Sequence, residues 1–489
     1  MSDAPLYLEP RLAPRLASLL DTSGLPHALV DGLGSPLNLV LPEQFAQNAA
    51  EFRSVLGRRR LGGRIYFAHK ANRSSALVRR LCTTGAALDA ASLGELQHAL
   101  ASGFTGDRIM VTGPKDPEFL WLAARCGATV NADGAGELEA AAALVRAYGL
   151  PRLRVLLRLS GFEVSGVRVL SRRSRFGTSV KDLDALLDVL GRHRDALEPV
   201  GVGYHLDTTS LDEKAAALEG CLRAVEELRL RGFQPHVVDV GGGFGVNYLA
   251  HAAQWERYTT ELTRAVTGRR PPLTWGGHAY GLRVENGTVK GALGLYPAHR
   301  PLAGPGYLDE LLSLPAPTLG RPLGTLLLES LCDLYAEPGR ALTDQCGVTL
   351  GRVLEVRPDA EGGPHLVRLA LNAGDVGLED HGVLVDPVLL RRGSTPPGPG
   401  GPVGVHLLGN LCLEADLITR RTVFLPALPD PGDLLAFANT AGYCMDFTAT
   451  GAQRQPTARK AAVEEVDGTW RWCLDEEYWP VTRSGGRYA

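Results

Sequence analysis

The lysine at position 70 closes a run of mostly apolar residues, Tyr66-Phe67-Ala68-His69-Lys70. A lysine at the mouth of a buried strand is partly desolvated, which favours the neutral amine that forms an imine with an aldehyde. We therefore take Lys70 as a candidate nucleophile. On this run alone, an ordinary surface lysine is the simpler interpretation.

A glycine run follows another apolar stretch, in Val240-Gly241-Gly242-Gly243-Phe244-Gly245. Consecutive glycines let backbone N–H groups approach an anion closely. The spacing does not match a dinucleotide-binding fingerprint, which needs GxGxxG at the opening of a helix. Gly241, Gly242 and Gly243 are therefore candidates for a phosphate-binding turn, or for a tight turn with no ligand.

The segment Glu337-Pro338-Gly339-Arg340 places a carboxylate and a guanidinium around a Pro-Gly turn. Arginine suits a phosphate because it donates paired hydrogen bonds, and a carboxylate can keep a pyridine nitrogen protonated. Two further candidates are His205, which ends an apolar run and could pack against a ring, and Cys412, which could donate a proton. Each also has an ordinary structural interpretation, as a core histidine and a small buried hydrophobe.

Together, these residues match the needs of a pyridoxal 5′-phosphate (PLP) site. Such a site requires an amine for the aldehyde, a partner for the pyridinium nitrogen, a phosphate cradle and a group against the ring face. Candidates for all four are present, and their order along the chain is more informative than any one motif.

The elements that would position these residues alternate between strands and helices from about residue 45 to 345. This alternation predicts a parallel (β/α)8 barrel of the TIM type, in which chemistry gathers where strands end. Lys70, Asp89, Arg158, His205, Gly241 and Glu337 all fall at such ends. We expect strands at Arg64–Ala68, Ala86–Asp89, Arg108–Thr112, Thr129–Asn131, Arg154–Leu159, Val202–Leu206 and Val237–Val240, with a helix at Ser74–Cys82.

Three other parts of the chain surround this pattern. Residues 346–489 contain short runs divided by turn clusters and predict a C-terminal antiparallel β domain. The N-terminal segment, 1–44, is expected to pack with that domain. Residues 247–315 form a long insertion in the barrel, with a helix expected at Ala252–Val266, and its aromatic residues favour an ordered segment.

The composition is globular, with 489 residues and a net charge of −3. This balance argues against nucleic acid or an anionic membrane as a partner. We find no secretory signal and no apolar stretch near the ~20 residues of a membrane span. The 8 cysteines lack CxxC pairs, so we expect a reduced, cytoplasmic protein with no metal site.

The order of these motifs resembles that of the fold type III (alanine-racemase-fold) PLP decarboxylases, which include diaminopimelate, ornithine and arginine decarboxylases. The resemblance spans roughly residues 40 to 450 and implies decarboxylation of an amino acid or an amino-acid-derived metabolite. By resemblance, Lys70 forms the Schiff base, Glu337 pairs with the pyridinium nitrogen, and Arg340 binds phosphate with the glycine backbone. The matching motifs are Phe67–Asn72, Asp89–Ser92 with Gly94-Glu95, Arg158, Arg175–Gly177, Gly241–Phe244, Glu337–Arg340, Gly409–Asp416 and Ala441–Tyr443.

The resemblance also implies a homodimer with shared active sites. In that family the cysteine matched by Cys412 comes from the partner subunit and protonates the carbanion after CO2 leaves. Tyr443 likewise matches a tyrosine that reaches the cofactor across the dimer. The resemblance further implies cofactor contacts for Asp89, Arg158, His205, Thr208 and Gly339, and substrate contacts for Glu414 and Asp416.

Three departures from the family pattern indicate an unusual substrate. Asp207 stands where the family has glycine, and a carboxylate ~5 Å from a phosphate would cost about 3 kcal/mol at an effective dielectric near 20. Asp207 therefore either points away or meets a cationic group of the substrate. Ala373-Gly374 replaces the Asp-Gly that binds the far ammonium of diamino acids, and the insertion is the third departure.

Three alternatives to decarboxylation remain open. A racemase or epimerase would share the lysine and the barrel but would need a second base, for which only Tyr443 and Cys412 are visible. Another PLP reaction, such as elimination or replacement, would use the same cofactor site. A non-catalytic PLP-binding homologue would typically lack the lysine or the phosphate arginine, and both residue types are present here.

Overall fold

The computed structural model describes residues 5–163, 174–360, 362–393 and 402–480 of the chain. It divides into two units, each assembled from separate stretches of sequence. The barrel unit comprises Phe45–Gly245, Leu302–Leu342 and the segment that begins at Tyr478. The β unit comprises the N-terminal segment to Gln44, Val246–Pro301 and Thr343–Glu477.

The barrel unit is a closed ring of eight parallel strands. β2 pairs with β3, and the ring continues through β4, β5, β6, β8, β9 and β12, which pairs with β2 again. The prediction of a (β/α)8 barrel is confirmed. The barrel strands are β2 Gly63–Ala68, β3 Ala87–Ala90, β4 Ile109–Val111, β5 Thr129–Ala132, β6 Leu153–Ser160, β8 Leu197–Tyr204, β9 Val237–Asp239 and β12 Asp333–Ala336; the two-residue β7, Thr178–Ser179, pairs with β6.

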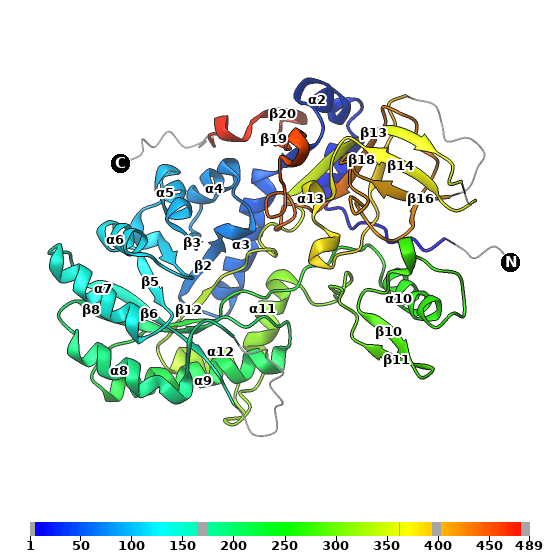
Figure 1. The fold of residues 1–489 in the computed structure, drawn as a ribbon. Helices are drawn as coiled ribbons and strands as arrows, with labels where there is room; N and C mark the ends of the chain where they lie inside the picture. The colour runs from blue at the N-terminus through cyan, green and yellow to red at the C-terminus, as the bar shows by residue number, and fades with distance from the viewer. Residues whose placement is uncertain (1–4, 164–173, 361, 394–401, 481–489) are drawn as a thin grey trace. The chain divides into compact units, whose positions relative to one another are not determined.

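Helices surround this ring of strands (Figure 1). Side-chain caps start several of them directly after barrel strands: Ser74, Ser92, Asp116 and Ser210 each accept a hydrogen bond from a backbone N–H in the first turn. These caps fix where each strand-to-helix loop ends. The helices are α3 Pro42–Arg58, α4 Ser75–Cys82, α5 Leu93–Ala101, α6 Pro117–Cys126, α7 Ala135–Ala147, α8 Leu183–Arg192, α9 Leu211–Leu230, α11 Gly304–Ser313 and α12 Leu323–Glu329.

Side chains fill one level of the barrel interior and make it a packed core rather than a pore. Tyr66 packs against Tyr335 with ring centroids 5.0 Å apart. A layer of this kind closes the inside of the barrel and leaves the ends of the strands for chemistry. The other members of this cluster are Ala87, Met110, Leu156, Val200 and Val237.

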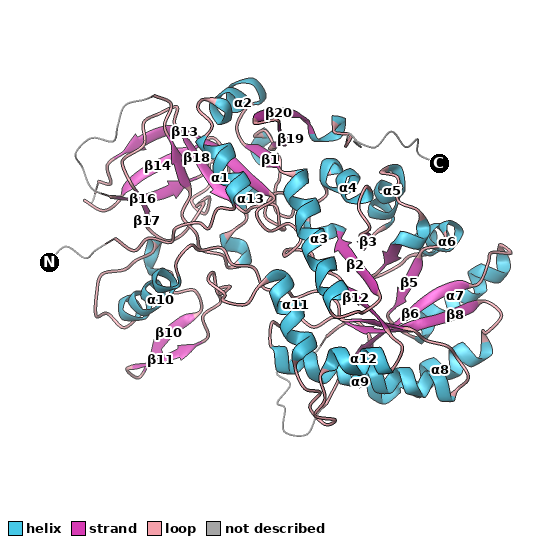
Figure 2. Cartoon of the chain, turned by 180° about the vertical axis from the view of Figure 1, so that it is seen from behind, coloured by secondary structure: helices cyan, strands magenta, loops and turns pink. Residues whose placement is uncertain are grey.

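The β unit is built on a mixed sheet in the order β17-β16-β14-β13-β1-β19-β20; β18 pairs with β13, and β15 pairs with β18. Figure 2 draws the strands in magenta. Most pairs are antiparallel, but β1–β19 and β14–β16 are parallel. The strands are β1 Leu37–Val40, β13 Gly347–Arg357, β14 His365–Leu369, β15 Val388–Leu390, β16 Val403–Leu408, β17 Val423–Leu425, β18 Leu434–Ala438, β19 Arg459–Val466 and β20 Thr469–Leu474.

Two parts of the sequence outside the C-terminal region also belong to the β unit. The N-terminal helices α1, Pro14–Asp21, and α2, Leu25–Leu33, bury Leu16, Leu19 and Leu29 in the same core as β1 and β13. The stretch 246–301 adds α10, Ala252–Val266, and a hairpin of β10, Leu282–Glu285, and β11, Thr288–Gly291. None of the described helices is long and apolar enough to span a membrane.

Candidate active site

The barrel brings the predicted barrel residues to the C-terminal ends of its strands. Lys70 follows β2, Asp89 lies in β3, and Arg158 lies in β6. His205 follows β8, the glycine run follows β9, and Glu337 follows β12. Thr208, Gly339 and Arg340 lie in the same set of loops. The end of the barrel that holds these loops is therefore the candidate active site.

Glu337 is a buried acid at this end of the barrel, and its carboxylate pairs with a histidine. Its side chain is 4% exposed, and its Oε2 lies 3.2 Å from Nδ1 of His205. Burial by itself would raise the pKa of Glu337, but its hydrogen bond to His205 and the nearby charge of Lys70 outweigh burial and lower that pKa to about 2. Burial lowers the pKa of His205, against the effect of Glu337. The Glu337 carboxylate is therefore ionised and shares a hydrogen bond with the His205 ring.

Two buried acids lie near Glu337 and behave differently from it. Burial and the charge of Glu337 raise the pKa of Asp89 and of Asp239 well above their usual range. Both carboxylate oxygens of Asp89, and Oδ2 of Asp239, are buried without a hydrogen-bonding partner among the described residues. Lys70 and Arg158 act in the opposite direction on Asp89 and lower its pKa. The charge of Lys70 thus acts on two buried acids with opposite pKa shifts, the ionised Glu337 and Asp89.

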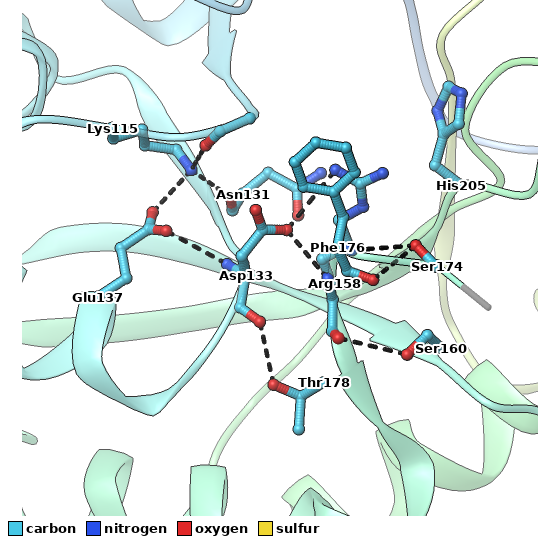
Figure 3. A network of polar contacts seen from close by, with 12 residues as sticks. Lys115, Asn131, Asp133, Glu137, Arg158, Ser160, Ser174, Phe176, Thr178 and His205 are labelled. Carbon is cyan, nitrogen blue, oxygen red and sulfur yellow. Dashed lines mark hydrogen bonds and ion pairs between the residues drawn. The ribbon is translucent and has the colours of Figure 1, made fainter.

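A polar network holds Arg158 (Figure 3). Its guanidinium lies 3.5 Å from a carboxylate oxygen of Asp133 and 4.9 Å from the ring centroid of Phe176. The backbone N–H of Asp133 in turn donates to Glu137, which pairs with the fully buried Lys115 at 2.6 Å. The network reaches from the loop after β4 to β6, so it fixes the guanidinium at the barrel mouth.

The histidine beside Lys70 is also part of a chain of polar contacts. Nε2 of His69 lies 2.7 Å from Nδ1 of His98, and Nδ1 of His69 lies 3.4 Å from Glu95. The second Glu95 oxygen accepts the N–H of Ala91. These contacts tie the short helix that carries Lys70 to α5.

The backbone of the glycine run lies too close to neighbouring carbonyl oxygens for a side chain to fit. A Cβ on Gly241 would lie 2.4 Å from the carbonyl oxygen of Tyr204, and one on Gly243 would lie 2.8 Å from that of Thr208. Gly241 and Gly243 have φ angles of 61° and 81°, in the left-handed region that favours glycine. The N–H groups of Gly243 and Phe244 have no hydrogen-bond acceptor in the described part of the chain. The turn therefore presents free donors that an anion can occupy.

The remaining predicted residues outside the barrel loops belong to the β unit. Cys412 and Glu414 are exposed, and Tyr443 is partly exposed with a φ of 71°. Asp416 is 6% exposed, and its two oxygens accept the N–H groups of Ala373 and Leu411, each at 2.8 Å. Its carboxylate thus joins two loops, and its predicted substrate contact stays a prediction.

Asp207, the unusual acid of the barrel loops, is exposed. The structure also shows functional candidates that we did not identify from the sequence: Asp239, Asp133 and Lys214. Asp239 ends an apolar run and could have been found by the same rule as Asp89. No sequence signal marks Lys214, because it lies in a helix where a lysine normally faces solvent.

Comparison with known proteins places the chain in a family. The family model described as "Pyridoxal-dependent decarboxylase, pyridoxal binding domain" matches residues 43–289, which is half of the chain. The chain belongs to the pyridoxal-dependent decarboxylase family. It is a PLP-dependent enzyme of the carboxy-lyase type, and its cofactor is PLP.

Relatives within the family are distant. An uncharacterized protein, y4yA, of Sinorhizobium fredii is 32% identical over 455 residues, which cover 89% of each chain. The diaminopimelate decarboxylase of Mycobacterium bovis is 26% identical over 496 residues, covering 96% of this chain and 97% of that one. Our chain is a divergent member of the pyridoxal-dependent decarboxylases.

Solved structures show the same fold at low sequence identity. Diaminopimelate decarboxylase from Helicobacter pylori, complexed with L-lysine, superposes with a TM-score of 0.64 at 17% identity and covers 91% of this chain and 95% of its own. Lysine/ornithine decarboxylase from Vibrio vulnificus, complexed with putrescine, has a TM-score of 0.64 at 19% identity, covering 94% and 100%.

The barrel residues of this pyridoxal-dependent decarboxylase fit the cofactor. The unpaired N–H groups at Gly243 and Phe244 suit a phosphate, and the ionised Glu337 suits a protonated ring nitrogen. The unpartnered oxygens of Asp89 beside Lys70 leave hydrogen-bonding capacity that the described residues do not use. The same end of the barrel thus supplies an amine, an acid for the ring and donors for the phosphate.

Proposed function

We propose that this chain decarboxylates an amino acid or an amino-acid-derived metabolite, with Lys70 as the amine that attaches the cofactor. The observation that carries the proposal is the buried, ionised Glu337 beside Lys70 at the barrel mouth. Bound PLP withdraws electrons from the bonds to the substrate α-carbon, and a carboxylate at its ring nitrogen makes it a better electron sink.

The other barrel residues hold the cofactor in this proposal. His205, whose ring shares a hydrogen bond with Glu337, packs against the ring face of the cofactor. Asp89 and Arg158 contact the cofactor from β3 and β6. The phosphate is bound by Thr208, Gly241, Gly242, Gly243, Gly339 and Arg340.

Residues of the β unit complete the proposed site. Cys412, whose thiol is exposed, donates the proton that replaces CO2, and Tyr443 contacts the cofactor. The loop of Cys412 is held at its N–H by Gln453, at 2.9 Å, and at Leu411 by Asp416. We further propose a cytoplasmic homodimer in which Cys412 and Tyr443 serve the site of the partner subunit.

The substrate differs from the diamino acids in this proposal. Two acids lie near the turn at Ala373-Gly374: Asp375 accepts the N–H of Asn372, and Asp416 accepts the N–H of Ala373, each at 2.8 Å. Both are buried, so the turn does not offer an exposed partner for a distal ammonium. The exposed Asp207 and Glu414 are the proposed substrate contacts instead, and Asp416 is proposed as a third through the lone pairs that its backbone hydrogen bonds leave unused.

The proposal is tested by incubating the purified enzyme with a panel of amino acids while CO2 release and α-proton exchange are both measured. We expect CO2 release from at least one amino acid, and none from the Lys70→Ala variant. Exchange at the α-carbon without CO2 release would identify a racemase or epimerase. Bound cofactor with no turnover of any amino acid would indicate a non-catalytic homologue.

A further inference from the structure

A buried lysine that the proposed chemistry does not use lies beneath the glycine run. Lys214, in the first turn of α9, is 0% exposed. Its Nζ donates a short hydrogen bond to the carbonyl oxygen of Gly242. The ammonium also lies over the faces of two aromatic rings, Phe244 at 5.1 Å and Tyr307 at 5.8 Å.

The charge of Lys214 has no direct counterion. No carboxylate lies within ion-pair distance of its Nζ among the described residues, and the nearest charged influences are Asp239 and Glu337. Burial lowers the pKa of Lys214 to about 8, although those two acids act to raise it. A buried cation that lacks an ion pair is costly, and it would be stabilised by an anion bound nearby.

The hydrogen bond from Lys214 to Gly242 places the positive charge at one end of a peptide unit. The carbonyl of Gly242 and the N–H of Gly243 belong to one peptide unit, and in a trans peptide they point to opposite sides. A cation on the carbonyl oxygen polarises the unit and makes the N–H a stronger donor. The N–H that is strengthened is the one without an acceptor among the described residues.

We propose that Lys214 is a positioning residue for anion binding: it polarises the Gly242–Gly243 peptide toward the cofactor's phosphate and supplies a positive charge behind it. Lys214 does not contact the phosphate itself. This inference rests on the proposed role of the glycine run as the phosphate site.

The test compares the affinities of the apo-enzyme for PLP and for pyridoxal, which lacks the phosphate. Both ligands react with the same amine, so the dissociation constant of pyridoxal divided by that of PLP measures the phosphate contribution.

We expect Lys214→Met to lower this preference for PLP about tenfold, and to weaken the competition of inorganic phosphate with PLP to a similar degree. Lys214→Arg, which keeps a cation, should retain most of the preference, and Lys181→Met, which removes an exposed barrel lysine, should leave it unchanged.

A pH series separates charge from packing. In wild type the preference for PLP should fall as pH rises from 7 to about 10, through the Lys214 pKa of about 8. The other titratable groups facing Lys214 are Asp239 on β9, Glu337 after β12, Tyr204 on β8 and Tyr307 on α11. The Lys214→Met variant keeps all four, so its preference should stay flat over the same range.

The outcomes distinguish this inference from the proposed function. If wild type binds pyridoxal as tightly as PLP and inorganic phosphate does not compete, the glycine run is not the phosphate site and both proposals fail. If wild type prefers PLP and Lys214→Met keeps that preference at every pH, the proposed function stands and Lys214 has only a packing role.

Discussion

Two buried acids, Asp89 in the barrel unit and Asp416 in the β unit, are held in opposite ways. Neither carboxylate oxygen of Asp89 has a hydrogen-bonding partner among the described residues, whereas both oxygens of Asp416 accept backbone N–H groups. Asp239 and Asp375 lie between these extremes, since each has one oxygen on a backbone N–H and one without a partner in the described part of the chain. The contrast between Asp89 and Asp416 separates an acid available for ligand chemistry from an acid that holds loops, and it predicts which substitutions affect turnover and which affect stability.

The largest expected effect tests whether the chemistry of the barrel depends on the β unit. Lys70→Ala and Cys412→Ala should each be strongly impaired, because one lacks the amine and the other the proton donor. The two variants are then mixed. If each active site is shared between subunits as proposed, random pairing makes about half of all dimers mixed, and each mixed dimer has one intact site of two. Activity should therefore recover to about a quarter of wild type. Activity is measured after demonstrated subunit exchange.

A failure of mixing to restore activity would contradict the shared-site model. Cys412 would then act in the site of its own subunit or in none. A cysteine that only packs would lower the free energy of unfolding by about 1–2 kcal/mol and leave turnover intact.

Glu337→Gln should lower kcat by several orders of magnitude while the cofactor stays bound. The neutral amide no longer favours a protonated ring nitrogen, so the cofactor becomes a weaker electron sink. Cofactor content is measured by absorbance and turnover by CO2 release. A rate within about tenfold of wild type, equivalent to a barrier change of about 1.4 kcal/mol, would show that Glu337 does not face the ring.

Asp416→Asn should affect stability more than cofactor binding. One backbone N–H, of Ala373 or Leu411, would face an amide NH2 instead of an oxygen, at a cost of about 1–3 kcal/mol in the free energy of unfolding. Denaturant unfolding measures this loss, and Glu414→Gln, an exposed change in the same loop, is the matched control and should stay within about 0.5 kcal/mol of wild type. An equally stable Asp416→Asn variant would contradict the loop-holding role.

The smallest effect concerns Asp375, whose pKa burial raises to about 6. Because this folded-state pKa exceeds the unfolded value, the acid stabilises the fold at low pH, and that contribution is lost as pH rises through about 6. Asp375→Asn should therefore gain stability relative to wild type between pH 5 and pH 8, by about 1 kcal/mol. Unfolding of both proteins across this range measures the difference, and a constant difference would mean that Asp375 does not titrate there.

The parts of the fold that local sequence patterns determine could be predicted well. The helix at Ala252–Val266 has the predicted bounds, and Ser74 caps the helix expected at Ser74–Cys82. Residues at strand ends were found because a barrel places all of them at one end. These signals depend on the chain's own periodicity and on neighbouring residues, which a single sequence contains.

Features that depend on distant partners could not be predicted. β1 is four residues long between Pro36 and Pro42, and its partners are β13 and β19, more than 300 residues later. Lys214 lies in α9, Leu211–Leu230, and only the three-dimensional structure shows that its amine turns toward Gly242. The same limit applies to the choice between Asp416 as a substrate contact and as a loop anchor.

The position of β1 in the sheet has a consequence for synthesis of the protein. β1 lies between β13 and β19 in the sheet, and both of these strands come later in the sequence, so neither has been synthesised when β1 is translated. At about 5–20 residues per second, β13 is complete roughly 15–60 s after β1. All eight barrel strands emerge in that interval, so the barrel can close while β1, whose four residues are all buried in the native sheet, is still without a partner. During this time the nascent chain carries an unpaired strand, and a chaperone that binds short apolar segments would find it there.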